Sequence, residues 1–207
     1  MGSNQVTAKS QNIRSILRAL LYHHQISRVE LAELTGLTTA TITNLVNELL
    51  SLGLVRENGL KQVPSPRVGR PRRTVELNPD ARFAIGVHIG IGEYQIVITN
   101  LKAKIIGFTS QKFEICETAD KVLHGIVNQI ENIISQIGIE RSLILGIGVG
   151  AAGLVNVETG TNIYAPNLCW ENIPIRDWIV QETGLPVVVD NNVRLMCLAE
   201  ATFGQGI

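Results

Sequence analysis

Apolar positions in the first fifty residues recur at helical spacing. A helix over residues 9–23 has one apolar face, made of Ile13, Ile16, Leu17, Leu20 and Leu21. Ser27 precedes VELAEL, and Glu30 follows three positions later, which is a capping-box pattern for the start of a second helix. Its inward face is predicted to carry Leu31, Leu34 and Leu37. Gly36 supplies a tight turn, and TTATITNLVNELLSLG (38–53) predicts a third helix. The short connection between the second and third helices predicts a helix-turn-helix.

Two β-type segments follow these helices. LVREN (54–58) and TVELN (74–78) bracket the stretch KQVPSPRVGRPRR (61–73), which holds three prolines, five basic residues and no acidic residue. Proline excludes a helix interior here, because it lacks the N–H donor and clashes with the preceding turn. The pattern predicts a hairpin wing, and residues 1–80 are therefore expected to form a winged helix-turn-helix domain.

The remaining sequence alternates between strand and helix patterns. Three strands are predicted over residues 84–91, 94–100 and 104–115, and they favour an antiparallel meander. A helix (120–137), a buried strand (143–151), a short helix (174–183), a second buried strand (185–190) and a last helix (193–203) complete the chain. This βββαβαβα order predicts an α/β fold for residues 81–207, namely a ribonuclease-H-like or actin-like lobe.

Composition and charge divide the chain in the same place. Apolar residues make up 45% of the 207 residues and the net charge is zero, which excludes an intrinsically disordered protein. Residues 1–80 contain ten basic and six acidic residues, a net charge of +4, whereas residues 81–207 contain eight and twelve, a net charge of −4. Such an asymmetry indicates two domains with different partners. The sequence has no apolar run that could span a bilayer and no signal segment, so we expect a cytoplasmic protein that does not bind membranes.

The polar face of the third helix and the basic wing are the candidate DNA contacts. The helix offers short side chains that fit a major groove, namely Thr38, Thr39, Thr41, Thr43 and Asn44. Threonines that only cap and cover an exposed helix would give the same pattern. The wing offers Arg67, Arg70, Arg72 and Arg73 around Gly69 and Pro71, and arginine in an extended segment can enter a narrow minor groove. A solvated basic loop is the alternative, which the preceding helix-turn-helix disfavours.

The chain resembles the ROK family of repressors, open reading frames and sugar kinases. The resemblance lies in ISRVELAELTGLTTATITNLVNELLSLGLV, GRPRRTVELNP, AIGVHIGIG, LGIGVGAAGLVNVETG, APNLCW and GLPVVVDNN followed by LAEATFG. Repressors of this family place a winged helix-turn-helix before a sugar-binding domain. The resemblance therefore implies that the first domain binds operator DNA and that the second binds a monosaccharide effector, such as glucose, xylose or a related sugar. It also implies a homodimer or higher oligomer on a near-palindromic operator of a carbohydrate catabolism operon.

Two departures from the family motifs argue against kinase activity. Kinases of the family carry Asp-x-Gly-Gly-Thr after the first strand, where this chain has His88 followed by Ile-Gly-Ile-Gly. They end the strand before the last helix with Asn-Asp, whose Asp is the general base, and Asn192 stands at that position. An amide cannot accept the proton of a sugar hydroxyl at neutral pH, although it can hydrogen-bond it. We therefore expect no enzymatic activity. A sugar kinase with an appended DNA-binding domain and a DNA-binding protein that answers to a protein partner remain as alternatives.

The same motif positions provide candidate sugar contacts. They are Gly153, Asn167, Asn191 and Asn192, because glycine allows close backbone approach and amides both donate and accept. Turn formation by Asn167 and helix capping by Asn191 or Asn192 are the structural alternatives, and Asp190 is another candidate cap. Trp170 is expected to pack in a core rather than stack on a sugar.

No cofactor or metal is expected in this chain. The cysteine-rich zinc motif of the family would lie beyond Ile207, so the chain is expected to end after the first ROK lobe, as a fragment or as a short form. The three cysteines, Cys116, Cys169 and Cys197, are scattered and odd in number. They are expected to be buried free thiols rather than a disulfide or a zinc pair.

Overall fold

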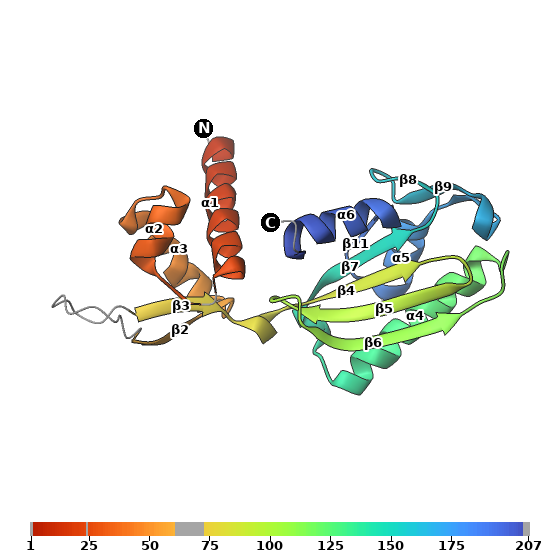
Figure 1. Ribbon diagram of the computed structural model, residues 1–207, viewed down its shortest axis with the longest axis horizontal. Coiled ribbons are helices and arrows are strands. Elements are labelled where there is room, and N and C mark those ends of the chain that lie inside the picture. The colour runs from red at the N-terminus through yellow and green to blue at the C-terminus, as the bar shows by residue number, and fades with distance from the viewer. Residues whose placement is uncertain (1, 24, 61–72, 205–207) are drawn as a thin grey trace. The chain divides into compact units, whose positions relative to one another are not determined.

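The computed structural model describes residues 2–23, 25–60 and 73–204, and side chains from residue 7 to 58 within the first two ranges. It divides the chain into two compact units, Met1–Ala81 and Arg82–Ile207 (Figure 1). The wing arginines Arg67, Arg70 and Arg72 lie outside the described residues.

The first unit is a winged helix-turn-helix, as predicted. Its helices are α1 (Gly2–Tyr22), α2 (Arg28–Thr35) and α3 (Thr39–Ser51). Its strands are β1 (Ile26–Ser27), β2 (Val55–Leu60) and β3 (Arg73–Leu77), which form an antiparallel sheet in the order β1-β3-β2. The predicted first helix begins earlier than the apolar face alone indicated, and the two-residue strand β1 was not predicted. A 3-10 turn, Pro79–Ala81, ends the unit.

Local sequence signals explain how α2 and α3 begin and end. The Ser27 side chain accepts a hydrogen bond from the backbone N–H of Glu30, whose carboxylate accepts one from the N–H of Ser27 in return, so the predicted capping box is confirmed. Gly36 follows α2 in the left-handed conformation (φ 69°), which lets the chain turn sharply into α3. These signals determine where α2 begins and where it ends.

The three helices and the sheet share one apolar core. Its buried members come from every element, and the fully buried ones include Ile16, Leu20, Leu31, Ile42, Val46 and Val75. The prediction for Leu34 was wrong, because its side chain is 56% exposed. The short helix α2 packs through Leu31, and Leu34 falls outside that contact face.

The second unit is built on a five-stranded mixed sheet in the order β11-β7-β4-β5-β6. Strands β4 (Phe83–Ile89), β5 (Glu93–Asn100) and β6 (Ile105–Lys112) form the predicted antiparallel meander. Strands β7 (Ile144–Ala151) and β11 (Val187–Asn191) are parallel to β4. Apart from three short strands described below, the order of elements along the chain is the predicted βββαβαβα. Its helices are α4 (Ala119–Ile137), α5 (Ile175–Thr183) and α6 (Asn192–Phe203).

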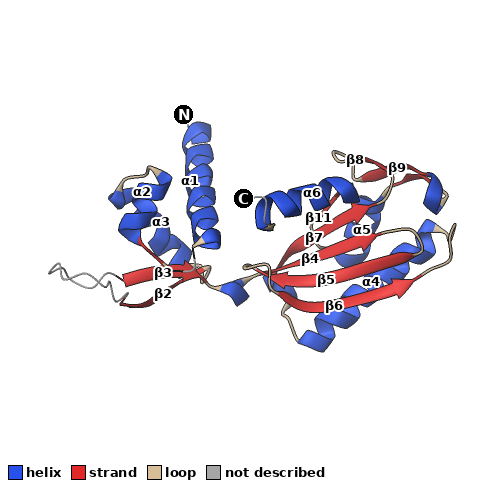
Figure 2. Ribbon diagram, viewed as in Figure 1, coloured by secondary structure: helices blue, strands red, loops and turns tan. Residues whose placement is uncertain are grey.

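One face of this sheet carries most of the core. Helices α4 and α5 cover this face (Figure 2). Alternate residues of the strands, such as Ile85, Ile96 and Val149, belong to the same buried cluster as the apolar residues of these helices. Helix α6 lies on the opposite face, where Leu195 approaches Gly150 so closely that a Cβ on this glycine would sit 3.2 Å from it. The parallel strands β4, β7 and β11 have their carboxyl ends at the same edge of the sheet, and α6 begins at this edge, directly after β11.

A small second sheet was not predicted. Strands β8 (Leu154–Asn156), β9 (Thr161–Ala165) and β10 (Trp170–Ile173) pair antiparallel in the order β10-β9-β8. These strands have only three to five residues each, which is too short for a clear alternating pattern. Two 3-10 turns, Arg141–Leu143 and Pro166–Leu168, complete the unit. Across the described residues, we find no helix with the length and apolarity that crossing a membrane requires.

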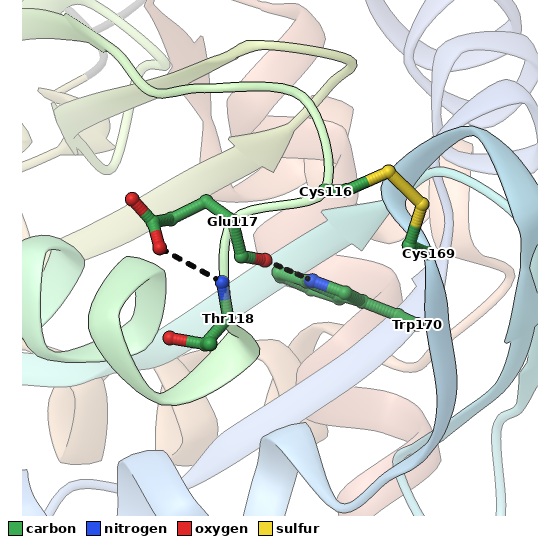
Figure 3. Close-up of a disulfide and its surroundings, with 5 residues drawn as sticks. All are labelled: Cys116, Glu117, Thr118, Cys169 and Trp170. Atoms are coloured by element: carbon green, nitrogen blue, oxygen red, sulfur yellow. Dashed lines mark hydrogen bonds between the residues drawn. A yellow bond between two sulfur atoms is a disulfide. The ribbon is translucent and has the colours of Figure 1, made fainter.

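The expectation of three buried free thiols was wrong. Cys116 and Cys169 form a disulfide, with Cα atoms 4.9 Å apart (Figure 3). All three cysteines, Cys197 included, are exposed. The two cysteines are 53 residues apart in sequence, so only packing could bring them together. Trp170, next to Cys169, is buried and donates a hydrogen bond from Nε1 to the carbonyl of Glu117, next to Cys116, at 3.1 Å. This contact holds the two segments together.

Candidate DNA-binding face and effector site

The N-terminal half of α3 presents its polar side chains in two groups. Thr38 caps the helix by accepting a hydrogen bond from the Thr41 backbone N–H at 3.2 Å, and the two hydroxyl oxygens are 2.9 Å apart. The Thr43 hydroxyl donates to the Thr39 carbonyl at 2.8 Å. These three hydroxyl groups have structural partners, which matches the capping alternative for Thr38 and Thr41.

Two side chains of the face remain available for a ligand. Thr39 and Asn44 are exposed, and neither side chain makes a hydrogen bond within the part of the chain that the structure describes. Four apolar residues on the other side of α3 hold it against the core, namely Ile42, Leu45, Val46 and Leu49. The helix is thus packed against the core, with an amide and a hydroxyl exposed on its first two turns.

The base of the wing is the part that the structure describes. Arg73, at the start of β3, is 73% exposed at its side chain and donates from Nη1 to Glu57 Oε2 at 3.1 Å. Arg56 of β2 pairs with Glu76 of β3 through Nε and Oε1, which are 2.5 Å apart. Arg73 is the one predicted wing contact whose surroundings can be described, and its guanidinium already has a carboxylate partner.

The candidate effector site lies where the parallel strands end. The pairing register places Ile89, Ala151 and Asn191 in one row, at the carboxyl ends of β4, β7 and β11. In open sheets with parallel strands, the carboxyl ends are where ligands usually bind. Gly153 and Asn191 lie at this edge, the first just after β7 and the second at the end of β11.

The Asn191 side chain connects the turn after β7 with the start of α6. Its Oδ1 accepts hydrogen bonds from the backbone N–H groups of Val193 (2.9 Å) and Arg194 (3.2 Å), so it is the N-cap of α6. Its Nδ2 donates to the Gly153 carbonyl at 2.8 Å. The capping alternative therefore describes Asn191, while Asp190 accepts from the Asn191 backbone N–H and faces Arg194 at 3.5 Å.

Gly153 is required by packing as well as by backbone conformation. Its φ is +101°, and a Cβ there would sit 2.5 Å from the Tyr164 carbonyl oxygen and 2.7 Å from the Ala165 Cβ. This contact brings the turn after β7 against the end of β9. Asn167 lies two residues further along, exposed on the 3-10 turn. Asn192 is half-buried, and its Oδ1 accepts from the Val193 N–H at 2.9 Å.

Sequence reasoning missed one residue of this edge. Asn162 of β9 is fully buried and donates from Nδ2 to the Ala152 carbonyl at 2.8 Å, so it braces the turn that carries Gly153. Its Oδ1 is buried and has no hydrogen-bond partner among the described residues. An asparagine inside an alternating strand would have been the signal, and it was lost because β9 itself was not predicted.

A second polar group lies on β5 and β6. The Gln95 amide and the Ser110 hydroxyl both donate to Glu93 Oε1, at 2.9 and 2.7 Å, and hold the pKa of this carboxyl below its usual value. His88 pairs with Gln95 in the strand register, and its ring lies beside Gly90, where a Cβ would sit 3.0 Å from Nε2. We find no group of three or more His, Cys, Asp or Glu side chains arranged to hold a metal ion in the described part of the chain.

Comparison with known proteins agrees with this architecture. The family model described as "ROK family" matches residues 84–206, which is more than half of the chain. The chain belongs to the ROK family. A second model, "Winged helix-turn-helix DNA-binding", matches residues 9–56.

Individual relatives combine the two parts. The chain is 32% identical to the xylose repressor of Caldicellulosiruptor bescii over 202 residues, which cover 98% of this chain and 50% of that protein. It is similar in structure to a ROK family transcriptional regulator described as a homolog of the E. coli MLC protein, with a TM-score of 0.73, 26% identity and coverage of 96% and 50% of the two chains. The chain thus spans about half the length of these relatives.

The ROK part alone also resembles an enzyme. A ROK family glucokinase from Streptomyces griseus, solved in complex with glucose and AMPPNP, is 28% identical with a TM-score of 0.54, over 60% of this chain and 38% of that one. The two family models and the regulator structure confirm the predicted fold class, an α/β protein with a winged helix-turn-helix followed by an actin-like lobe.

Proposed function

We propose that this chain forms the DNA-binding unit and the first effector-domain lobe of a sugar-responsive transcriptional repressor. The observation that carries the proposal is continuity: one xylose repressor aligns with 98% of the chain, and one ROK transcriptional regulator superimposes over 96% of it. Both comparisons run through the winged helix-turn-helix and into the ROK lobe, whereas the glucokinase covers 60%. The DNA-binding unit is therefore what this chain shares with the regulators.

Operator DNA is the partner proposed for the first unit. Thr39 and Asn44 would enter the major groove, where an amide can bind adenine through two hydrogen bonds and threonine can contact thymine or phosphate. The N-terminus of α3 favours a phosphate through its free N–H groups. Arg73 and the other predicted wing arginines would add contacts to the backbone or the minor groove. A homodimer that binds two half-sites completes the proposal.

A monosaccharide is the effector proposed for the second unit. Asn167 is exposed and offers both a donor and an acceptor, as a sugar hydroxyl requires. Asn191 has its side chain committed to α6 and to Gly153, so its contribution would be to hold the turn after β7 in place. Xylose is the first sugar to test, because several relatives are named xylose repressors. Sugar binding would act on DNA binding by favouring one of two arrangements of the dimer.

We propose no phosphoryl transfer. Asn192 cannot act as the general base that accepts a proton from the sugar, and His88 stands where the family kinases carry an acid. Loss of a positioned base alone lowers catalysis by about 10²–10⁴-fold. A coupled ADP-release assay across hexoses and pentoses tests this. Turnover above background that disappears in Asn192→Ala would replace the repressor proposal with the kinase alternative.

Selection from a random duplex pool tests the DNA-binding proposal. The full chain is expected to enrich one sequence, which fluorescence anisotropy then compares with a scrambled duplex at several salt concentrations. Asn44→Ala is expected to weaken binding to the selected duplex by about 5–150-fold, because one good amide–adenine contact contributes ~1–3 kcal/mol. Asn132→Ala, on the exposed side of α4, is the matched control and should leave binding unchanged. Failure of the wild-type chain to prefer any sequence would refute the proposal.

A further inference from the structure

A cluster of four side chains joins α3 to the base of the wing. Arg28 Nη2 donates to Asn47 Oδ1 and to Glu57 Oε1, both at 2.9 Å, and Arg73 Nη1 donates to Glu57 Oε2 at 3.1 Å. We call Arg28, Asn47, Glu57 and Arg73 the wing-base cluster. Its members come from α2, α3, β2 and β3, so one carboxylate links three elements of the first unit directly and the fourth through Arg28 (Figure 1).

The cluster differs from ordinary surface ion pairs. An isolated exposed pair has little effect, because water screens it and two long side chains must be ordered. Here the side chains of Arg28 and Glu57 are only 27% and 30% exposed, and each has two partners. A guanidinium also presents its donors in a fixed planar fork, which defines direction as well as distance. The cluster is therefore suited to fixing geometry.

The geometry that it fixes borders the candidate DNA face. Asn47 lies four residues after Thr43, one turn further along the same side of α3. Arg73 is the described wing arginine, and Glu57 holds its guanidinium. Both oxygens of Glu57 occupy arginine donors that could otherwise bind DNA phosphate. Glu57 thus neutralises charge at the wing base while it holds two arginines in a fixed relation to α3.

We propose that Glu57 is a specificity-determining residue of DNA binding. It positions Arg28 and Arg73 relative to α3, and it reduces the binding of these arginines to DNA phosphates that is independent of base sequence. This rests on the proposed DNA-binding function. Arginines held in one direction can contact DNA phosphates fully only when α3 is bound to its preferred bases in the major groove. Without the carboxylate, the same arginines are free to bind phosphates in any register, and discrimination falls.

Two substitutions separate charge from geometry. Glu57→Gln keeps the shape and removes the negative charge, so we expect tighter binding to a scrambled duplex, a steeper salt dependence and a ratio of selected to scrambled affinity lowered by about tenfold. Arg28→Lys keeps the charge and loses the planar fork, so we expect weaker binding to the selected duplex and unchanged binding to the scrambled one. Glu48→Gln is the matched control. Glu48 is on α3, and among the residues that the structure describes its carboxylate pairs with Lys9 alone, at 2.8 Å, so loss of its charge should change both affinities equally.

The experiment is fluorescence anisotropy with the full chain on the selected and scrambled duplexes. Wild-type selectivity is measured first, and its absence would count against the proposed function rather than against this inference. Given a selective wild type, a lower ratio in both Glu57→Gln and Arg28→Lys, with the Glu48→Gln ratio unchanged, supports the assignment. An unchanged ratio in Glu57→Gln, or a parallel loss on both duplexes, overturns it. Circular dichroism of each variant shows whether a parallel loss comes from unfolding, in which case Arg28→Lys alone decides.

Discussion

Replacing Asn191 by alanine should destabilise the second unit measurably. The side chain makes three hydrogen bonds: two cap the N-terminus of α6, and the third, at 2.8 Å, holds the Gly153 carbonyl. No neighbouring side chain among the described residues holds both the turn after β7 and the start of α6. The substitution therefore separates two segments that are 38 residues apart in sequence.

The magnitude follows from the contacts. Loss of an asparagine N-cap costs about 1 kcal/mol of unfolding free energy. Loss of the bond to Gly153 costs about another 1 kcal/mol. We therefore expect Asn191→Ala to lower the stability by about 2 kcal/mol. Asn191→Asp keeps an oxygen that can cap α6 but has no donor for the Gly153 carbonyl, so about 1 kcal/mol should be lost.

Tryptophan fluorescence can follow this unit alone. Both tryptophans of the chain, Trp170 and Trp178, lie in the second unit. With a urea m-value of about 2 kcal/mol/M, the unfolding midpoint should fall by about 1 M for Asn191→Ala and about 0.5 M for Asn191→Asp. Asn132→Ala is the surface control. A midpoint for Asn191→Ala within about 0.2 M of the wild type, on the same m-value, would refute the reasoning that this side chain joins the two segments.

Three further predictions concern local geometry. Thiol titration of the native chain should find one reactive thiol before reduction and three after it, and three before reduction would contradict the pairing. Cys169→Ser, which removes the crosslink to Cys116, should lower the free energy of unfolding of the second unit, measured in urea, by up to about 4 kcal/mol. Gly153→Ala should destabilise this unit by at least about 2 kcal/mol, because the strain of a positive φ adds to a backbone clash. Gly138→Ala, at a φ of +73° and with open space around it, should cost about 1 kcal/mol, and equal costs would show that the clash at Gly153 has no effect. Ser27→Ala should remove about 1 kcal/mol of local stability from α2, seen as faster amide hydrogen exchange in its first turn, and unchanged exchange would dismiss the capping box.

Sequence alone determined the features that depend on neighbouring residues. The capping box of Ser27 and Glu30 spans four positions, so its hydrogen bonds follow from local geometry. The helices α3 and α4 and the strands of the large sheet were predicted because apolar residues recur at fixed spacing over many positions. The short strands β8 to β10 offered no such repetition, and Leu34 lies on a helix of eight residues where spacing defines the buried face poorly.

Tertiary structure decided which distant residues meet. The parallel register of β7 and β11 places Asn191 beside the turn that carries Gly153, and no local pattern encodes that hydrogen bond. Burial of Trp170 against the Glu117 carbonyl brings Cys169 to Cys116. The wing-base cluster joins Arg28 to Asn47 and Glu57, 19 and 29 residues away. Residue types and spacing thus predicted a DNA-binding unit and a sugar-type lobe, but contacts between segments that the chain brings together only on folding decided how their side chains are held.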